Sequence, residues 1–164
     1  MSAPTRCLLV YPEFTSQSFW NYRATCDLVG AAYPATPLGL ITVAAMLPAS
    51  WHCRLVDCNV GSLTDADLAW ADVVFTGGMI AQQRSTLAMS ERCRAAGKPV
   101  VVGGPDATSS PHLYDRADYQ VLGEAEVTLP RWLSGYQAGT AQHRYQCGEE
   151  KADVTTSPLP RFDL

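Results

Sequence analysis

The sequence predicts an α/β fold in which five parallel strands form a doubly wound sheet, with helices on both of its faces. Three observations predict this fold class. Strand-like and helix-like patterns alternate along the 164 residues. The strand-like runs are apolar almost throughout, as is typical of parallel strands covered on both faces. Several of these runs end at glycine, which lets a ligand approach bare backbone at the carboxyl edge of a sheet.

Each expected element begins or ends at a recognisable signal. Thr36 and Pro37 are an N-cap and an N1 proline for the first helix, which is apolar on nearly every side and should be buried. Residues 62–65 resemble a capping box, and Gly97 is a C-cap. In order, we expect strands at Arg6–Tyr11, Trp51–Asp57, Ala71–Thr76, Lys98–Val102 and Ala117–Leu122, and helices at Leu38–Leu47, from the capping box to about Trp70, and at Gln82–Ala96, Thr108–Asp115 and Glu126–Tyr136.

Two segments fall outside this minimal fold. Residues 12–35 are a long, aromatic-rich connection after the first strand, where about two to six residues are usual. This connection is either a lid or domain contact, or a packed insertion. Residues 139–164 are polar and end in a proline-punctuated stretch. We therefore expect one domain at residues 1–138 and a tail or linker at 139–164.

Composition and charge exclude several classes of partner. The net charge of −4 comes without any block of like charges, so neither nucleic acid nor an anionic membrane surface is an expected partner. The apolar runs are too short for a signal sequence or a membrane span. We expect a cytoplasmic protein.

The cysteines and histidines do not predict a metal site. No two of the six cysteines stand at C-x-x-C spacing, and free thiols in a reducing compartment are the favoured interpretation. The three histidines are isolated from one another and from acidic residues at ligand spacing. The residues concerned are Cys7, Cys26, Cys53, Cys58, Cys93, Cys147, His52, His112 and His143.

The expected binding site lies at the carboxyl edge of the sheet. In a flavodoxin-like or Rossmann-like strand order, a ligand binds between strands one and three, where the winding reverses. Tyr11 and residues 76–79 end these two strands, and the turns at 103–105 and 123–124 follow strands four and five. Glycine in three of these four turns favours a ligand over tight turns alone.

Known ligands of this architecture can be compared with the residues present. A nicotinamide site needs G-x-G-x-x-G after the first strand, where this chain has no glycine. Residues 15–18 supply hydroxyl groups without a glycine, so flavin phosphate is a weak candidate. Tyr11 and Thr76 stand where a phosphoacceptor domain needs acidic residues, and no hydrolytic triad is evident. A binding module for a flavin or a protein partner stays open as an alternative.

Six segments point to a more specific assignment. Along nearly the whole chain they are, in order, Tyr11–Phe14, Pro37–Pro48, Arg54–Val60, Gly103–Pro105, Gly123–Pro130 and Pro160–Leu164. Together they resemble the cobalamin (vitamin B12)-binding N-terminal domain of cobalamin-dependent radical SAM enzymes, in the subgroup that contains the hopanoid methylases. The Gly-Gly-Pro and Gly-Glu-Ala-Glu segments are the most specific part of the resemblance.

The resemblance implies where the cofactor binds. In such domains the corrin ring lies over the carboxyl edge of the sheet, and the nucleotide tail, displaced from cobalt, enters a groove beside the strands. The residues that match this pattern are Tyr11, Gly77, Gly78, Met79, Gln82, Gly103, Gly104, Pro105, Thr108, Gly123, Glu124, Ala125 and Glu126. The two glutamates also suit a helix N-terminus electrostatically.

The resemblance also implies the reaction and the partner. Such enzymes methylate a substrate radical, using methylcobalamin together with S-adenosylmethionine and a [4Fe-4S] cluster held by C-x-x-x-C-x-x-C in a following radical SAM domain. That motif is absent from this sequence, so we expect the chain alone to hold cobalamin, to carry no catalytic residue and to be inactive. The substrate remains open.

The state of cobalt can be predicted as well. Many cobalamin carriers place a histidine from D-x-H-x-x-G on cobalt, whereas residues 11–16 contain none. We therefore expect base-off, His-off cobalamin, its lower face covered by residues 78–83 with Met79 and Gln82 nearest.

Overall fold

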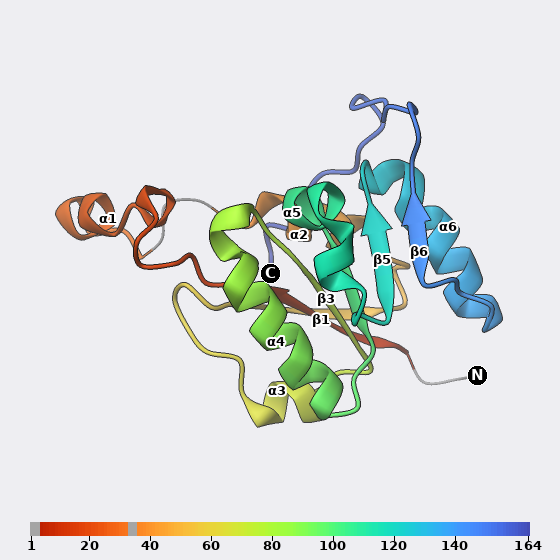
Figure 1. The fold of residues 1–164 in the computed structure, drawn as a ribbon, viewed down its shortest axis with the longest axis horizontal. Helices are drawn as coiled ribbons and strands as arrows, with labels where there is room; N and C mark the ends of the chain where they lie inside the picture. The colour runs from red at the N-terminus through yellow and green to blue at the C-terminus, as the bar shows by residue number, and fades with distance from the viewer. Residues whose placement is uncertain (1–3, 33–35) are drawn as a thin grey trace.

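The computed structural model describes residues 4–32 and 36–164, with Trp20 described without its side chain. The strands form one parallel sheet in the order β2-β1-β3-β4-β5-β6 (Figure 1). The winding therefore reverses between β1 and β3, as the sequence predicts. The strands are β1 Arg6–Tyr11, β2 His52–Asp57, β3 Val73–Gly77, β4 Val100–Gly103, β5 Tyr119–Leu122 and β6 Arg144–Gln146.

The sheet has six strands, and the prediction of five was wrong. The additional strand, β6, lies in the segment predicted as a tail and pairs in parallel with β5. Arg144 Nε donates to Gln120 Oε1 at 2.7 Å, and its guanidinium forms an ion pair with Asp115 at 2.6 Å. The sequence does not predict β6, because its three residues are mostly polar and largely exposed at the edge of the sheet. So short a strand carries no apolar pattern from which it could be predicted. The side-chain contacts of Arg144 add to the backbone pairing with β5 that holds β6 in place.

Helices cover both faces of the sheet. Leu8 and Val10 of β1 pack into the core beneath α3, α4 and α5, whereas Cys7 and Leu9 pack into the core beneath α2 and α6. This alternation is the two-residue period of a strand buried on both faces. The helices are α1 Arg23–Val29, α2 Leu38–Met46, α3 Asp65–Trp70, α4 Gln83–Ala95, α5 Gly104–Ser109 and α6 Ala125–Ala138, and the 3-10 turns are η1 Phe19–Asn21, η2 Ile80–Gln82 and η3 Pro111–Tyr114.

Aromatic packing fixes α6 on the sheet. The Trp132 side chain is completely buried and its ring stacks on Tyr136, with centroids 4.7 Å apart. The rings of Phe75 and Tyr119 pack edge-to-face against the same indole, with centroid distances of 5.2 and 5.6 Å. Because these contacts come from two strands, they hold the helix at a defined distance from the sheet.

Three helix predictions need correction. The capping box expected at residues 62–65 lies at Thr64 and Asp67, where the Thr64 hydroxyl accepts the Asp67 N–H at 3.2 Å and Asp67 Oδ2 accepts the Thr64 N–H at 3.1 Å. The helix expected at Thr108–Asp115 begins earlier, as α5 at Gly104, and is followed by the separate turn η3. Pro105 suits the first turn of a helix, and Pro111 cannot continue α5, so the prolines set both limits. The N-cap of α2 is Pro37 rather than Thr36, and α2 has no side-chain cap.

The long connection after β1 forms an arm. Its η1 and α1 project away from the sheet at the left of Figure 1. Leu28 and Val29 on α1 are largely exposed. Residues 33–35, which include Tyr33 of the aromatic-rich segment, lie outside the described residues.

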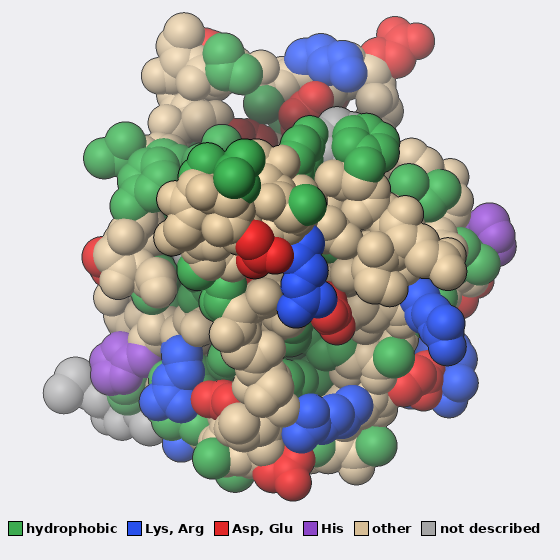
Figure 2. Space-filling view, turned by 90° about the vertical axis from the view of Figure 1, so that its left-hand side faces the viewer, with side chains coloured by type: hydrophobic (Ala, Val, Ile, Leu, Met, Phe, Trp, Pro, Cys, Tyr) green, Lys and Arg blue, Asp and Glu red, His purple; other side chains and the backbone are tan. Residues whose placement is uncertain are grey.

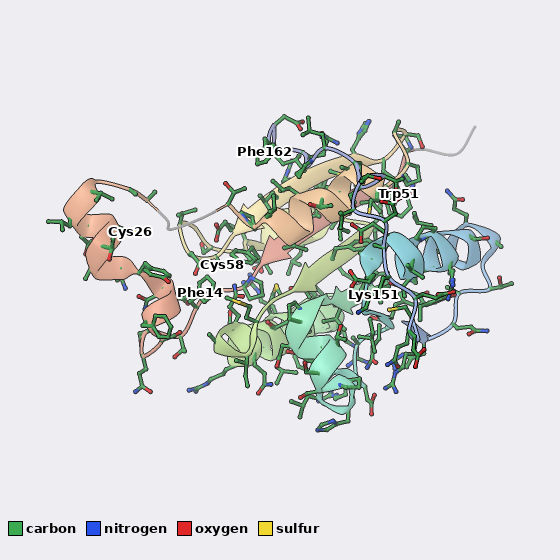
Figure 3. The ribbon with its side chains drawn as sticks, turned by 90° about the horizontal axis from the view of Figure 1, so that it is seen from above. Phe14, Cys26, Trp51, Cys58, Lys151 and Phe162 are labelled. Carbon is green, nitrogen blue, oxygen red and sulfur yellow. The ribbon has the colours of Figure 1, made fainter. Side chains whose placement is uncertain are left out.

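The segment after β6 returns across the helices of one face. In Figure 3, Lys151 and Phe162 lie along this segment. Ser157 Oγ donates to Glu126 Oε1 at 2.6 Å, and the Arg161 N–H donates to the Ile41 carbonyl at 3.0 Å. Leu164 then packs against the core beneath α2 and α6. No helix within residues 4–32 and 36–164 has the length and apolar character needed to cross a membrane.

Candidate functional site

A groove of about 330 Å³ opens at the carboxyl edge of the sheet, between the sheet and the helices α2 and α6. Its floor is Phe75, Val101 and Val121, on the sheet face that carries these helices. Most of its walls are aliphatic. The lining residues are Tyr11, Pro37, Leu38, Gly39, Leu40, Val43, Phe75, Thr76, Gly77, Gly78, Met79, Gln82, Val101, Gly103, Gly104, Pro105, Val121, Gly123, Ala125 and Leu129.

Glycines replace side chains where the groove reaches the edge of the sheet. Gly77 of β3 is the register partner of Gly103 of β4, and each lies two residues beyond a floor residue, on the same face. A Cβ on Gly77 would lie 2.5 Å from the Gly103 carbonyl oxygen, and one on Gly103 would lie 2.7 Å from the Val121 oxygen. The strands therefore require these glycines, and the groove gains bare backbone as a result.

The turns after β4 and β5 require glycine for conformational reasons. Gly104 has φ +85° and Gly123 has φ +81°, both in the region that side chains rarely adopt. A Cβ on Gly123 would also collide with Cys147 Sγ, which accepts the Glu124 N–H at 3.3 Å. Sequence reasoning left this contact out, because Cys147 was expected in a tail.

Gln82 connects the ends of β1 and β3. Its side chain is buried, with Oε1 accepting the Met79 N–H at 3.0 Å and Nε2 donating to the Pro12 carbonyl at 2.6 Å. The amide thus holds η2 against the exit of β1. Beside it, burial raises the pKa of the Tyr11 phenol, although a hydrogen bond with Gln82 opposes the shift.

Asp106, in the first turn of α5, likewise joins separate segments. Its N–H donates to the Gly78 carbonyl at 3.1 Å, and its buried carboxylate accepts from Gln83 Nε2 at 3.0 Å and from the Tyr114 hydroxyl. Burial, and the hydrogen bond to this carboxylate, raise the pKa of Tyr114. Asp106 therefore couples the start of α5 to the turn after β3.

Three predicted site residues do not line the groove: Thr108, Glu124 and Glu126. Thr108 Oγ1 donates to the Gly104 carbonyl at 2.8 Å and accepts the Gly123 N–H at 2.9 Å, so it ties two glycine turns together. Glu126 accepts from Ser157. The other ten predicted residues line the groove. That the thirteen residues bind a cofactor stays a prediction.

Sequence reasoning missed the wall that α2 supplies. Its apolar character on nearly every side was taken as a sign of burial alone. One side packs on the sheet, however, and another faces the groove. The lining residues missed in this segment are Pro37, Leu38, Gly39, Leu40 and Val43, and those missed elsewhere are Phe75, Val101, Val121 and Leu129.

Charged groups do not form a patch on the face shown in Figure 2, which lies on the side from which α1 projects. Acidic and basic side chains are scattered there among hydrophobic ones. None of the three histidines lines the groove. His52 begins β2 at the opposite edge of the sheet, and His143 Nδ1 lies 3.1 Å from the Asp118 carbonyl oxygen. His112 lies in η3.

The fold and the groove define a class of protein: a doubly wound domain that binds a ligand between its sheet edge and two helices. Residues 25–133 match the family model described as the B12 binding domain, and the chain belongs to this family. The resemblance drawn from the sequence is thereby confirmed.

Two curated relatives are methyltransferases by name. The chain is 44% identical over 161 residues to an uncharacterized methyltransferase of Synechocystis sp.. It is 33% identical over 167 residues to the hopanoid C-2 methylase of Rhodopseudomonas palustris. Each match covers 97% of this chain but only 30% and 31% of the relatives, so the chain spans less than a third of their length. No solved structure shows a significant match.

Proposed function

We propose that this chain holds methylcobalamin for a radical SAM methyltransferase, with the nucleotide tail of the cofactor in the groove and its corrin ring at the carboxyl edge of the sheet. The groove suits a largely apolar, flat group because its walls are aliphatic and its end is bare glycine backbone. Gly77 and Gly103, which the neighbouring strands require, leave bare backbone there for the cofactor to approach. When bound, cobalamin supplies a transferable methyl group on cobalt.

Within this proposal, the chain's own residues bind and orient the cofactor. Tyr11, Met79 and the turn that Gln82 holds lie at the edge of the sheet where the corrin ring would rest. The η2 turn carries the exposed Ile80 beside Met79, and Gln82 has both its polar groups engaged with backbone. Met79 and Ile80 are therefore the better candidates to cover the lower face of cobalt, and Gln82 is a positioning residue.

The observation that carries the His-off part is the placement of the histidines. None of the three histidines lines the groove. Many other cobalamin carriers place a cobalt-binding histidine just after the first strand, and residues 11–16 of this chain contain no histidine. A site that offers cobalt no histidine would favour the low-coordinate cobalt states that loss of a methyl group requires. We therefore propose base-off, His-off binding.

The remaining machinery belongs outside this chain in our proposal. The [4Fe-4S] cluster and S-adenosylmethionine require C-x-x-x-C-x-x-C, which this sequence lacks. The curated relatives are about three times as long as the matched region, which leaves room for a radical SAM domain. We expect residues 139–164 to lead toward it.

Two measurements test the proposal on the 164-residue chain. Titration with hydroxocobalamin, followed by visible absorbance, should give a one-to-one complex with a base-off spectrum. Paramagnetic resonance of the cobalt(II) form should show cobalt lines without nitrogen splitting. Triplet splitting would reveal an axial nitrogen and contradict the His-off, base-off assignment, whereas a flavin spectrum of the purified protein would favour the alternative module. Anaerobic reconstitution with iron and sulfide should assemble no stoichiometric cluster.

A further inference from the structure

Six glycines line the groove, and the chain's own structure accounts for five of them. Gly77 and Gly103 are required because a Cβ on either would meet backbone of the neighbouring strand. A Cβ on Gly78 would lie 2.7 Å from Gln82 Oε1, the atom that caps the η2 turn. Gly104 and Gly123 have positive φ. These glycines would be needed even if nothing bound in the groove.

Gly39 is different. It is the second residue of α2 and lines the groove, its φ is not positive, and a Cβ built on it meets no heavy atom within 4 Å. Glycine is a poorer helix former than any residue except proline. Alanine would therefore fit this position and favour the helix. Nothing within residues 4–32 and 36–164 calls for glycine at this position.

The position of Gly39 in the groove suggests what the open space is for. On α2 the other lining residues are large: Leu38 and Leu40, which flank Gly39 in the first turn, and Val43 one turn on. Gly39 is therefore the one position of the α2 wall that presents bare backbone to the groove.

We propose that Gly39 is a specificity-determining residue: the planar base of the nucleotide tail lies against the bare backbone of the first turn of α2, in space that a side chain would take. This inference rests on the proposed function and adds a wall to the site that the resemblance did not include. Its physical basis is steric, since a Cβ and any larger group would narrow the groove without disturbing the fold.

Three variants of the 164-residue chain test the proposal. Gly39→Ala should keep or raise the melting temperature while weakening hydroxocobalamin binding several-fold. Gly39→Leu should weaken it by about 10- to 100-fold, the usual effect of forcing extra methylene groups into a filled site. Gly61→Leu is the matched control, because Gly61 lies outside the groove and its Cβ would meet only the Asp57 carbonyl oxygen, at 3.7 Å. It should bind as the wild type does.

The outcomes separate this inference from the proposed function. Wild-type chain that binds no cobalamin would defeat both. Wild-type binding together with unchanged affinity in Gly39→Ala and Gly39→Leu would overturn the role of Gly39 alone. Cobinamide, which lacks the tail, should bind Gly39→Leu as well as it binds the wild type. An equal loss for cobinamide and cobalamin would overturn the assignment of this wall to the tail. If Gly39→Leu does not fold, Gly39→Ala decides.

Discussion

The amide of Gln82 should stabilise the binding edge of the sheet more than any exposed residue nearby. Replacing it with methionine keeps the length and approximate volume of the side chain but removes its donor and its acceptor. The Met79 N–H would then lose its partner, and the Pro12 carbonyl would keep only the donor Asn59 Nδ2, at 3.2 Å. Because Gln82 is 1% exposed, water cannot readily take its place.

The cost follows from these two contacts. A buried polar group left without a partner costs about 1–3 kcal/mol and the loss of one hydrogen bond about 0.5–1.5 kcal/mol, so Gln82→Met should lower the free energy of unfolding by roughly 2–4 kcal/mol. For a chain of this size the melting temperature should fall by about 5–15 °C. Arg84→Ala, an exposed change two residues later, is the control and should stay within about 0.5 kcal/mol of the wild type.

Gln82→Glu adds a dependence on pH. The carboxyl keeps the acceptor for Met79, but it can donate to Pro12 only when protonated. Burial should raise its folded pKa above the unfolded value of about 4.3. The stabilising contact is then present below about pH 4 and is lost as the pH rises through the folded pKa. This variant should therefore lose stability, relative to the wild type, between pH 4 and 7.

Denaturant unfolding monitored by tryptophan fluorescence measures both effects. A Gln82→Met variant within about 0.5 kcal/mol of the wild type would show that the amide does not hold the edge. So would a Gln82→Glu variant whose stability follows the wild-type pH profile. Cobalamin affinity measured on the same variants should fall as well, because Gln82 holds the η2 turn in place at the binding edge.

Two further changes probe the neighbourhood of the groove. Gly104→Ala should destabilise the fold by about 1–2 kcal/mol, because it forces a side chain to φ +85° with its Cβ 3.3 Å from the Gly78 N atom; an unchanged melting curve would contradict this. Cys53 should react with iodoacetamide before Cys7. The hydrogen bond from Cys7 and the charge of Arg161 lower the pKa of Cys53, whereas the same hydrogen bond and burial raise the pKa of Cys7. The thiolate is the reactive form, so the thiol with the lower pKa reacts first. Peptide mass spectrometry would show the order, and modification of Cys7 first would refute it.

Local patterns determined much of the fold. The apolar strand runs and helix signals placed β1 to β5 and most helices within a few residues, because burial on both faces leaves an unbroken apolar run in the sequence. The glycines after β3, β4 and β5 marked the binding edge, since parallel strands bring their carboxyl ends to one side. The family segments likewise depend on residues that are close in sequence.

What only the tertiary structure decided depends on contacts between distant residues. β6 pairs with β5 and is fixed by the Arg144 side chain, which contacts Gln120 of β5 and Asp115 after η3. A Cβ on Gly123 would collide with Cys147, which follows β6. The groove itself needs α2 and α6 to stand on the same sheet face, and Gly39 acquires a meaning only when the space beside it is known to be open. A sequence pattern indicates which residues are buried, but not which residues of other segments they contact. Those contacts form only when the chain folds and brings together segments that are far apart in the sequence.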